Sequence, residues 1–169
     1  EVHPLSSFAS HIRPGDVITM VGGQPVNSPA EVIYRMSLAG IGAETTVTRL
    51  RDGAEDVVQI ALIAAPDRPP RNPLETGPRA AIPKMTLSTI NPAVIEQYRL
   101  PLMSEGVMVE DPGPFGARAG LRPGDILRAI NGVSVNSSRA ARAALEEAMN
   151  TLSLDLWRDG RRMALRFRI

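Results

Sequence analysis

The sequence contains no cysteine, and only two histidines and one tryptophan occur among its 169 residues. Without cysteine the chain can form neither a disulfide framework nor a thiolate zinc site, and it has no cysteine nucleophile. No apolar run approaches the roughly 18 to 20 residues that a membrane-spanning helix requires. Neither sign of charge dominates, because 19 Lys and Arg residues accompany 18 Asp and Glu residues. We therefore expect no membrane span and no general attraction to nucleic acid.

Motifs of catalysis and of cofactor binding are missing as well. The sequence has neither a Gly-x-Ser-x-Gly nor a Gly-Asp-Ser-Gly stretch, and such stretches carry the nucleophile of serine hydrolases. Two histidines, His3 and His11, do not make a transition-metal cluster. The chain begins Glu1-Val2-His3, and we expect it to be a fragment of a longer protein. We predict no catalytic residue, no bound metal and no cofactor within it.

The chain contains an internal repeat, which is its most informative feature. Residues 12–28 and residues 121–137 are identical at eight of 17 aligned positions, among them the run Arg-Pro-Gly-Asp. The triplet Arg51-Asp52-Gly53 recurs as Arg158-Asp159-Gly160. This pattern predicts two copies of one domain. We place the first copy at residues 1–65 and the second at residues 81–169.

The Arg-Pro-Gly-Asp run has a structural role in each copy. Gly15 and Gly124 allow a positive φ, so that the chain can turn sharply into the next strand. Asp16 and Asp125 are expected to accept backbone N–H bonds within that turn. These are duties of a scaffold, and we assign neither carboxylate a catalytic role.

Residues 66–80 separate the two copies, and their composition is that of a linker. Five prolines lie between Pro66 and Pro78, and each of them removes a backbone donor and fixes φ. An extended and fairly stiff spacer is the favoured interpretation. A proline-rich ligand for another module is the alternative, although PxxP spacing is common in linkers.

The alternation of apolar and polar residues predicts a mainly β fold for each copy. In the second copy it predicts five strands and three helices, the strands at Met85–Ile90, Gly106–Glu110, Asp125–Ile130, Leu152–Arg158 and Arg161–Ile169, and the helices at Ala93–Tyr98, Pro114–Ala119 and Ser138–Met149. The last two strands join through Asp159-Gly160 as a hairpin. Many short strands with a short and a long helix per copy predict an α+β roll, in the form of a small, partly open β-barrel.

The first copy repeats only the later part of this order. Its long helix begins at a capping box, Ser28-Pro29-Ala30-Glu31, and its closing hairpin is predicted at Thr45–Arg51 and Val57–Ile63. Glu1-Val2 corresponds to the end of the strand at Gly106–Glu110, so the first copy is expected to lack its N-terminal strands. An unpaired sheet edge recruits other strands. We therefore expect a homo-oligomer at high concentration.

The order of these motifs resembles that of a PDZ domain. The stretch Ala119-Gly120-Leu121-Arg122-Pro123-Gly124-Asp125, followed after the long helix by Arg158-Asp159-Gly160, is similar to the PDZ domains of bacterial HtrA proteases. The tandem arrangement with a Pro-rich spacer is similar to the Do-type (DegP/DegQ-like) subgroup. In that subgroup a trypsin-like serine protease domain precedes two PDZ domains in the bacterial envelope.

The resemblance implies a non-catalytic, peptide-binding and regulatory segment of a periplasmic serine endopeptidase. PDZ domains bind extended or C-terminal peptides by adding them as a strand to a sheet edge. The implied partners are unfolded or C-terminal peptide segments of client proteins, together with the parent protease domain. The alternative is a PDZ scaffold module of an envelope protein that carries no protease.

The resemblance places the peptide groove of the second copy between its first strand and its long helix. The carboxylate-binding turn aligns with Ile82-Pro83-Lys84-Met85, where Pro83 has no N–H and Lys84 replaces the usual glycine. We therefore predict a weak grip on a ligand carboxylate. Small helix residues would leave a roomy apolar pocket, although helix propensity alone explains them equally well. The remaining candidates on the strand and the helix are Thr86, Leu87, Ser88, Ala140, Ala141 and Ala144.

Overall fold

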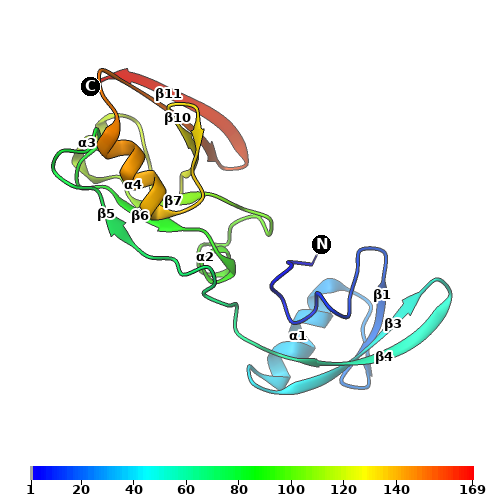
Figure 1. The fold of residues 1–169 in the computed structure, drawn as a ribbon. Coiled ribbons are helices and arrows are strands. Elements are labelled where there is room, and N and C mark those ends of the chain that lie inside the picture. The colour runs from blue at the N-terminus through cyan, green and yellow to red at the C-terminus, as the bar shows by residue number, and fades with distance from the viewer. Residues whose placement is uncertain (1) are drawn as a thin grey trace. The chain divides into compact units, whose positions relative to one another are not determined.

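The computed structural model describes residues 2–169, which form two compact units (Figure 1). The first unit extends to Pro66, and the second unit runs from Asp67 to Ile169. Each unit contains its own antiparallel sheet. Within the described part of the chain, no helix has the length and apolar character needed to cross a membrane. The mainly β fold predicted for the two copies is confirmed.

The first unit is a four-stranded antiparallel sheet with one helix. The strand order is β2-β1-β3-β4. Its helix begins as the capping box predicts, because Ser28 Oγ accepts a hydrogen bond from the N–H of Glu31 at 3.2 Å. The elements are β1 (Val17–Val21), β2 (Gln24–Pro25), α1 (Pro29–Ala39), β3 (Glu44–Arg51) and β4 (Ala54–Ala61).

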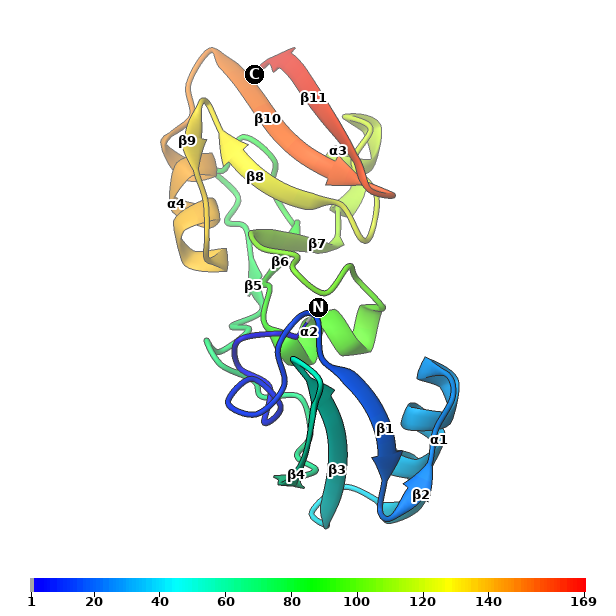
Figure 2. The ribbon, with the colours of Figure 1, turned by 90° about the vertical axis from the view of Figure 1, so that its right-hand side faces the viewer.

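The second unit is a seven-stranded sheet with three helices (Figure 2). Its strands follow the order β11-β10-β8-β7-β6-β5, and β9 pairs with β8. The strands are β5 (Leu74–Glu75), β6 (Thr86–Thr89), β7 (Val107–Asp111), β8 (Ile126–Ile130), β9 (Val133–Ser134), β10 (Thr151–Arg158) and β11 (Arg161–Arg168). The helices are α2 (Pro92–Tyr98), α3 (Gly113–Arg118) and α4 (Ser138–Glu147).

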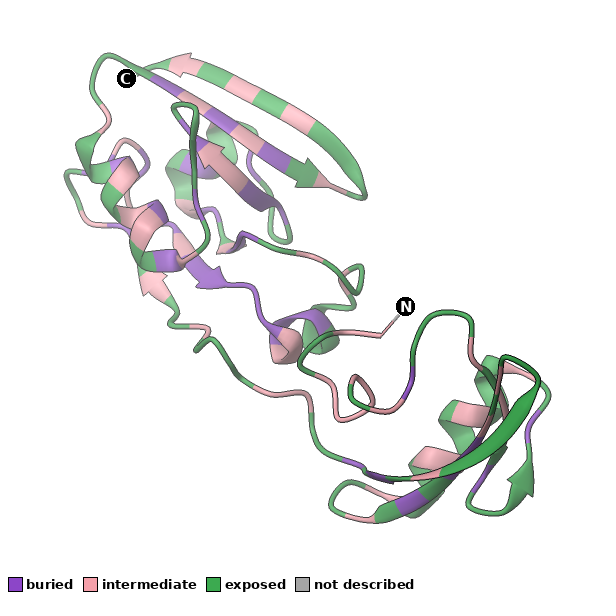
Figure 3. Ribbon diagram, turned by 45° about the vertical axis from the view of Figure 1, so that its right-hand side comes forward, coloured by how far each residue is buried: buried purple, intermediate pink, exposed green. Residues whose placement is uncertain are grey.

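Side-chain alternation along β10 shows how this sheet builds its core (Figure 3). Leu152, Leu154 and Leu156 are buried on one face, whereas Trp157 is 43% exposed. The leucines pack with residues of β6, β7, β8 and α4 in a single cluster. The sheet therefore has one apolar face, and it curves around a core without closing into a barrel.

The two long helices occupy equivalent places in the repeat but are buried to different extents. In α4, Ala141 and Leu145 are fully buried. In α1 no residue is buried, and Ile33, Tyr34 and Leu38 are exposed. Among residues 2–66 the first unit has no counterpart of β5, β6 and β7, whereas α4 packs on all three of these strands as well as on β8. This agrees with a first copy that lacks its N-terminal strands.

The short helix predicted in each copy is wrong for the first. Residues 4–11 form successive turns instead, with the N–H of Ala9 donating to the Ser6 carbonyl. His3 Nδ1 accepts the N–H of Leu5, and Ser6 Oγ accepts that of Phe8. Side chains that bind nearby backbone amides in this way compete with helical hydrogen bonding.

The segment predicted as a linker, residues 66–80, contains regular structure. Leu74–Glu75 forms β5 and pairs with β6. Near its start, the Asn91 side chain donates to the carbonyl oxygen of Pro69 at 2.7 Å. The later part of the segment is therefore integrated into the second unit, and the exact boundaries of the two domains stay predictions.

Candidate functional site

In the second unit, β6 and α4 flank the place where the sequence predicts a peptide groove. The first turn of α4 is tied to β6, because the N–H of Ser138 donates to Thr89 Oγ1 at 2.9 Å. Farther along α4, Ala141 and Leu145 pack in the core. Strand and helix are therefore held at a fixed separation.

Most of the predicted site residues surround this groove without offering a free side chain to it. The Ser88 hydroxyl, for example, donates to Glu110 Oε1 at 2.6 Å. Lys84 is the exception, because it alone among the candidates is exposed. On this side the strand can therefore pair through its backbone rather than through its side chains, which is how strand addition works. The buried candidates are Ile82, Met85, Leu87, Ser88 and Ala141, and the half-buried ones are Pro83, Thr86, Ala140 and Ala144.

The edge of β6 that faces away from β7 is covered by the chain's own residues 71–76, which we call the strap. Within the strap, β5 pairs antiparallel with β6, and Leu74 lies opposite Leu87 (Figure 2). At its start, the carbonyl oxygen of Arg71 accepts the N–H of Thr89 at 2.7 Å. The strap thus completes the sheet on the side where a ligand strand would be added.

The strap also contacts α4 across the groove. Ser138 Oγ donates to the carbonyl oxygen of Asn72 at 2.6 Å. The strap therefore lies between β6 and α4, in the position of a bound peptide. Between strap and helix a hollow of about 400 Å³ remains open, lined by Asn72, Pro73, Leu74, Arg139, Arg142, Ala143 and Glu146.

The last strap residue, Thr76, fills the predicted carboxylate turn and is only 2% exposed. Its carbonyl oxygen accepts the N–H of Lys84 at 3.2 Å, and its Oγ1 accepts the N–H of Met85 at 2.9 Å. The same hydroxyl donates to the carbonyl oxygen of Ile82 at 2.6 Å. Two successive amides thus bind two oxygens of one residue, which is the arrangement that a carboxylate would need.

This turn is a better donor than its sequence suggests. Pro83 offers no N–H, but the amides of Lys84 and Met85 both donate toward the strap. Lys84 adopts a φ of 58°, the left-handed conformation for which glycine is usual. Gly113 at the start of α3 supports the turn closely, since a Cβ there would overlap the Lys84 carbonyl oxygen. The predicted weakness of the turn as a carboxylate site therefore does not follow from its backbone geometry.

A buried ion pair, which the sequence motifs alone do not predict, stabilises the second unit. Asp125 is 1% exposed and accepts hydrogen bonds from Arg158 Nε and Nη2 at 2.7 and 2.6 Å. The same carboxylate raises the pKa of Arg158 and accepts the N–H of Arg122 at 2.9 Å. Arg158 Nη2 also donates to the carbonyl oxygen of Gly120 at 2.7 Å. The pair joins the Arg-Pro-Gly-Asp turn to the closing hairpin.

The first unit contains an equivalent ion pair, between Asp16 and Arg51. Asp16 accepts hydrogen bonds from Arg51 Nε and Nη2, each at 2.7 Å, and from the N–H of Arg13 at 2.8 Å. The hydrogen bonds from Arg51 and Arg13 hold the pKa of Asp16 well below its usual range. Both aspartates thus accept a backbone N–H as predicted. The recurring Arg-Asp-Gly triplets were the available signal for the two arginines.

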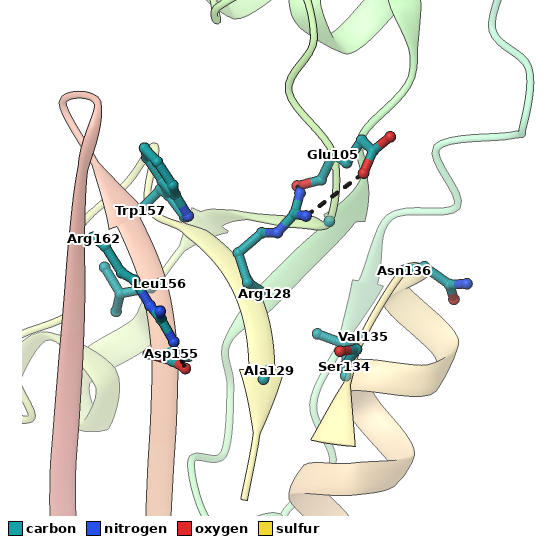
Figure 4. A pocket seen from close by; sticks show the side chains of 11 residues that line it. Glu105, Arg128, Ala129, Ser134, Val135, Asn136, Asp155, Leu156, Trp157 and Arg162 are labelled. Atoms are coloured by element: carbon teal, nitrogen blue, oxygen red, sulfur yellow. Dashed lines mark hydrogen bonds and ion pairs between the residues drawn. The ribbon is translucent and has the colours of Figure 1, made fainter. Parts of the chain in front are cut away.

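A second hollow, of about 410 Å³, lies on the sheet beside Trp157 (Figure 4). Its charged side chains are paired with each other, because Arg128 lies 3.5 Å from Glu105 and Arg162 lies 2.7 Å from Asp155. The hydrogen bond from Arg162 lowers the pKa of Asp155. Across residues 2–169, no group of three or more His, Cys, Asp or Glu residues could hold a metal ion. The hollow therefore shows paired surface charges and no assembled reactive group.

Comparison with known families identifies a domain in each unit. Family models for the PDZ domain match residues 1–62 and residues 106–153. The second match includes the Arg-Pro-Gly-Asp turn and all of α4. Both copies of the repeat therefore match the same kind of domain.

The chain is also similar to bacterial serine proteases, in alignments 161 residues long that cover 94% of the chain. It is 27% identical to the probable periplasmic serine protease do/HhoA-like of Haemophilus influenzae and covers 32% of that protein. It is 26% identical to the periplasmic pH-dependent serine endoprotease DegQ of Escherichia coli and covers 33% of it. It is 26% identical to the periplasmic serine endoprotease DegP of Escherichia coli and covers 31% of that protein. The chain thus spans about a third of the length of the curated relatives it matches.

Proposed function

The chain belongs to the PDZ domain family, with one domain in each of its two units, and from this premise we propose that it is the non-catalytic, peptide-binding and regulatory segment of a periplasmic serine protease of the HtrA (Do) family. The similarity to DegQ and DegP along 94% of the chain supports such a parent. Because the chain covers only a third of these relatives, the protease activity of the parent belongs to the proposal too. So does the periplasm as its location.

The proposed ligand is an extended segment of a client protein, unfolded or at a C-terminus. One observation carries this proposal: β6 accepts an antiparallel strand beside α4, and the adjoining turn directs two amides at the end of that strand. Backbone pairing of this kind accepts many sequences, because it uses no particular ligand side chain. The proposed contact surface is the one predicted above, residues 82–88 with Ala140, Ala141 and Ala144.

Fluorescently labelled casein, an unfolded protein, provides the test. We expect the purified chain to raise the anisotropy of the labelled casein without cleaving it. Cleavage that persists through exhaustive purification would contradict a non-catalytic segment. If neither the wild-type chain nor the strap variant described below binds casein or a peptide, the peptide-binding proposal fails.

The gene upstream of the codon for Glu1 separates the two candidate parents. A His, Asp and Gly-Asp-Ser-Gly series there would support a trypsin-like protease. Its absence from the complete gene would favour the alternative, a PDZ scaffold module in an envelope protein.

A further inference from the structure

The groove of the second unit already holds a strand, and that strand belongs to the chain itself. On the basis of the peptide-binding function proposed above, we propose that the strap (residues 71–76) is a built-in competitor of the ligand. It occupies the groove in the resting domain, and an external peptide binds only after the strap has moved aside. The segment between the two repeats then regulates the second PDZ domain.

The direction of the strap matches that of a ligand strand with a free C-terminus. It runs antiparallel to β6 and ends with Thr76 at the turn of residues 82–85. The N–H of Thr76 donates to the Met85 carbonyl at 2.8 Å, and the Lys84 amide donates to the Thr76 carbonyl at 3.2 Å. A terminal carboxylate would present its two oxygens to the amides that now bind Thr76. Strap and peptide therefore exclude each other.

The strap can leave the groove without unfolding the domain. Asn72, Pro73 and Glu75 are exposed, and Pro73 has no N–H to donate to β6. Leu74 is half-buried, and among the strap residues Thr76 alone is buried. Segments with few buried apolar contacts open locally far more readily than the whole domain unfolds.

The tether makes the strap an effective competitor. Residues 77–81 alone connect Thr76 to the turn, and short connections give effective concentrations of about 1 mM or more. The apparent Kd of an external peptide equals its intrinsic Kd divided by the fraction of open chains. If about one chain in 100 is open, the strap weakens peptide binding about 100-fold.

A disulfide that locks the strap tests this proposal in the whole 169-residue chain. Glu75 and Thr86 lie opposite each other in the β5–β6 pair, and neither is buried. Because the chain has no cysteine of its own, E75C/T86C can form only this intramolecular disulfide, and dithiothreitol reopens it. The probe is a fluorescein-labelled peptide with the sequence of residues 69–76 and a free carboxylate. We expect the oxidised variant to bind the probe at least about tenfold more weakly than the reduced variant.

Thr76→Val provides the opposite perturbation. Valine keeps the shape of threonine but leaves the Met85 amide without its hydroxyl acceptor, which favours the open strap. We expect the probe to bind about tenfold more tightly, a factor that corresponds to 1.4 kcal/mol. Hydrogen exchange at the Thr89 amide, which donates to Arg71, should accelerate. Thr48→Val, at a buried threonine of the first unit, is the matched control and should change neither quantity.

The outcomes separate this inference from the function on which it rests. Equal probe binding by the oxidised and reduced double variants, both folded by circular dichroism, would overturn the strap as a competitor and leave peptide binding intact. Faster exchange at Thr89 in the Thr76→Val chain with no probe binding would overturn the groove as a peptide site. Tight binding only after reduction or in Thr76→Val supports both.

Discussion

Arg158→Met removes one partner of the buried ion pair in the second unit. Asp125, which is 1% exposed, would lose the two hydrogen bonds of 2.7 and 2.6 Å from the guanidinium. Methionine preserves most of the side-chain volume, so the loss is electrostatic rather than one of packing. The N–H of Arg122 remains as a partner of the carboxylate, but it carries no charge.

The expected cost follows from the burial of this pair. Removing one partner of a buried ion pair destabilises a protein by about 3 to 5 kcal/mol, because the remaining charge is left uncompensated. A domain of this size has a free energy of unfolding of about 5 to 15 kcal/mol. With a urea m-value near 2 kcal/mol/M, the unfolding midpoint should fall by about 2 M.

Trp157, the single tryptophan, reports unfolding of the second unit by its fluorescence. Arg162→Met is the matched control, since Arg162 lies in the same hairpin with 71% of its side chain exposed. Exposed ion pairs contribute little, and we expect this control to leave the midpoint nearly unchanged. The reasoning would be refuted if Arg158→Met and Arg162→Met shifted the midpoint equally.

Three further predictions concern the turn, the first unit and the ligand. Gly113→Ala should lower the urea midpoint of the second unit more than Gly124→Ala does, because both have positive φ but only Gly113 has a backbone oxygen, that of Lys84, in the way of a Cβ; equal shifts would contradict this. The pKa of Asp16 is lowered in the folded state. Its contribution to the stability of the fold is therefore complete above the unfolded pKa of about 3.9, and it is lost as the pH falls further toward the folded pKa. Urea unfolding followed by circular dichroism at pH 7 and pH 3 should therefore show a smaller pH dependence of stability for Asp16→Asn than for the wild-type chain. An unchanged pH dependence would count against a stabilising role of the Asp16–Arg51 ion pair. In the Thr76→Val chain, a free-acid peptide should bind about tenfold more tightly than its amide, because two backbone amides can hold the carboxylate; equal Kd values from matched titrations would rule out a working carboxylate turn.

Much of the fold is predictable because the repeat and its turns are local signals. The long helix of the second copy begins at Ser138, as its capping serine indicates, and the closing hairpin turns at Asp159 and Gly160, both with positive φ. The short helix of the first copy fails for a local reason as well. The side chains of Ser6 and His3 accept hydrogen bonds from nearby amides, and these bonds replace the helical ones. The first copy therefore has no helix at the position where the second copy forms one.

The occupied groove is not predictable from the sequence in the same way. A proline-rich composition indicates an extended segment, and the strap is indeed extended. Composition alone, however, does not predict the strand edge with which the strap pairs. The pairing depends on tertiary contacts, namely the Ser138 hydroxyl at Asn72 and the fit of Thr76 in the turn. For the same reason Pro83 suggested a poor carboxylate turn, although the backbone around Lys84 aims two amides at one residue.

The most direct test of the central claim is to map where a peptide binds. The free-acid peptide of residues 69–76 would be titrated into ¹⁵N-labelled Thr76→Val chain, and backbone amide shifts would be followed by NMR. We predict that the largest changes fall on residues 84–89 and on α4, with little change in the first unit. Saturable binding whose shifts leave β6 and α4 unchanged would contradict the account.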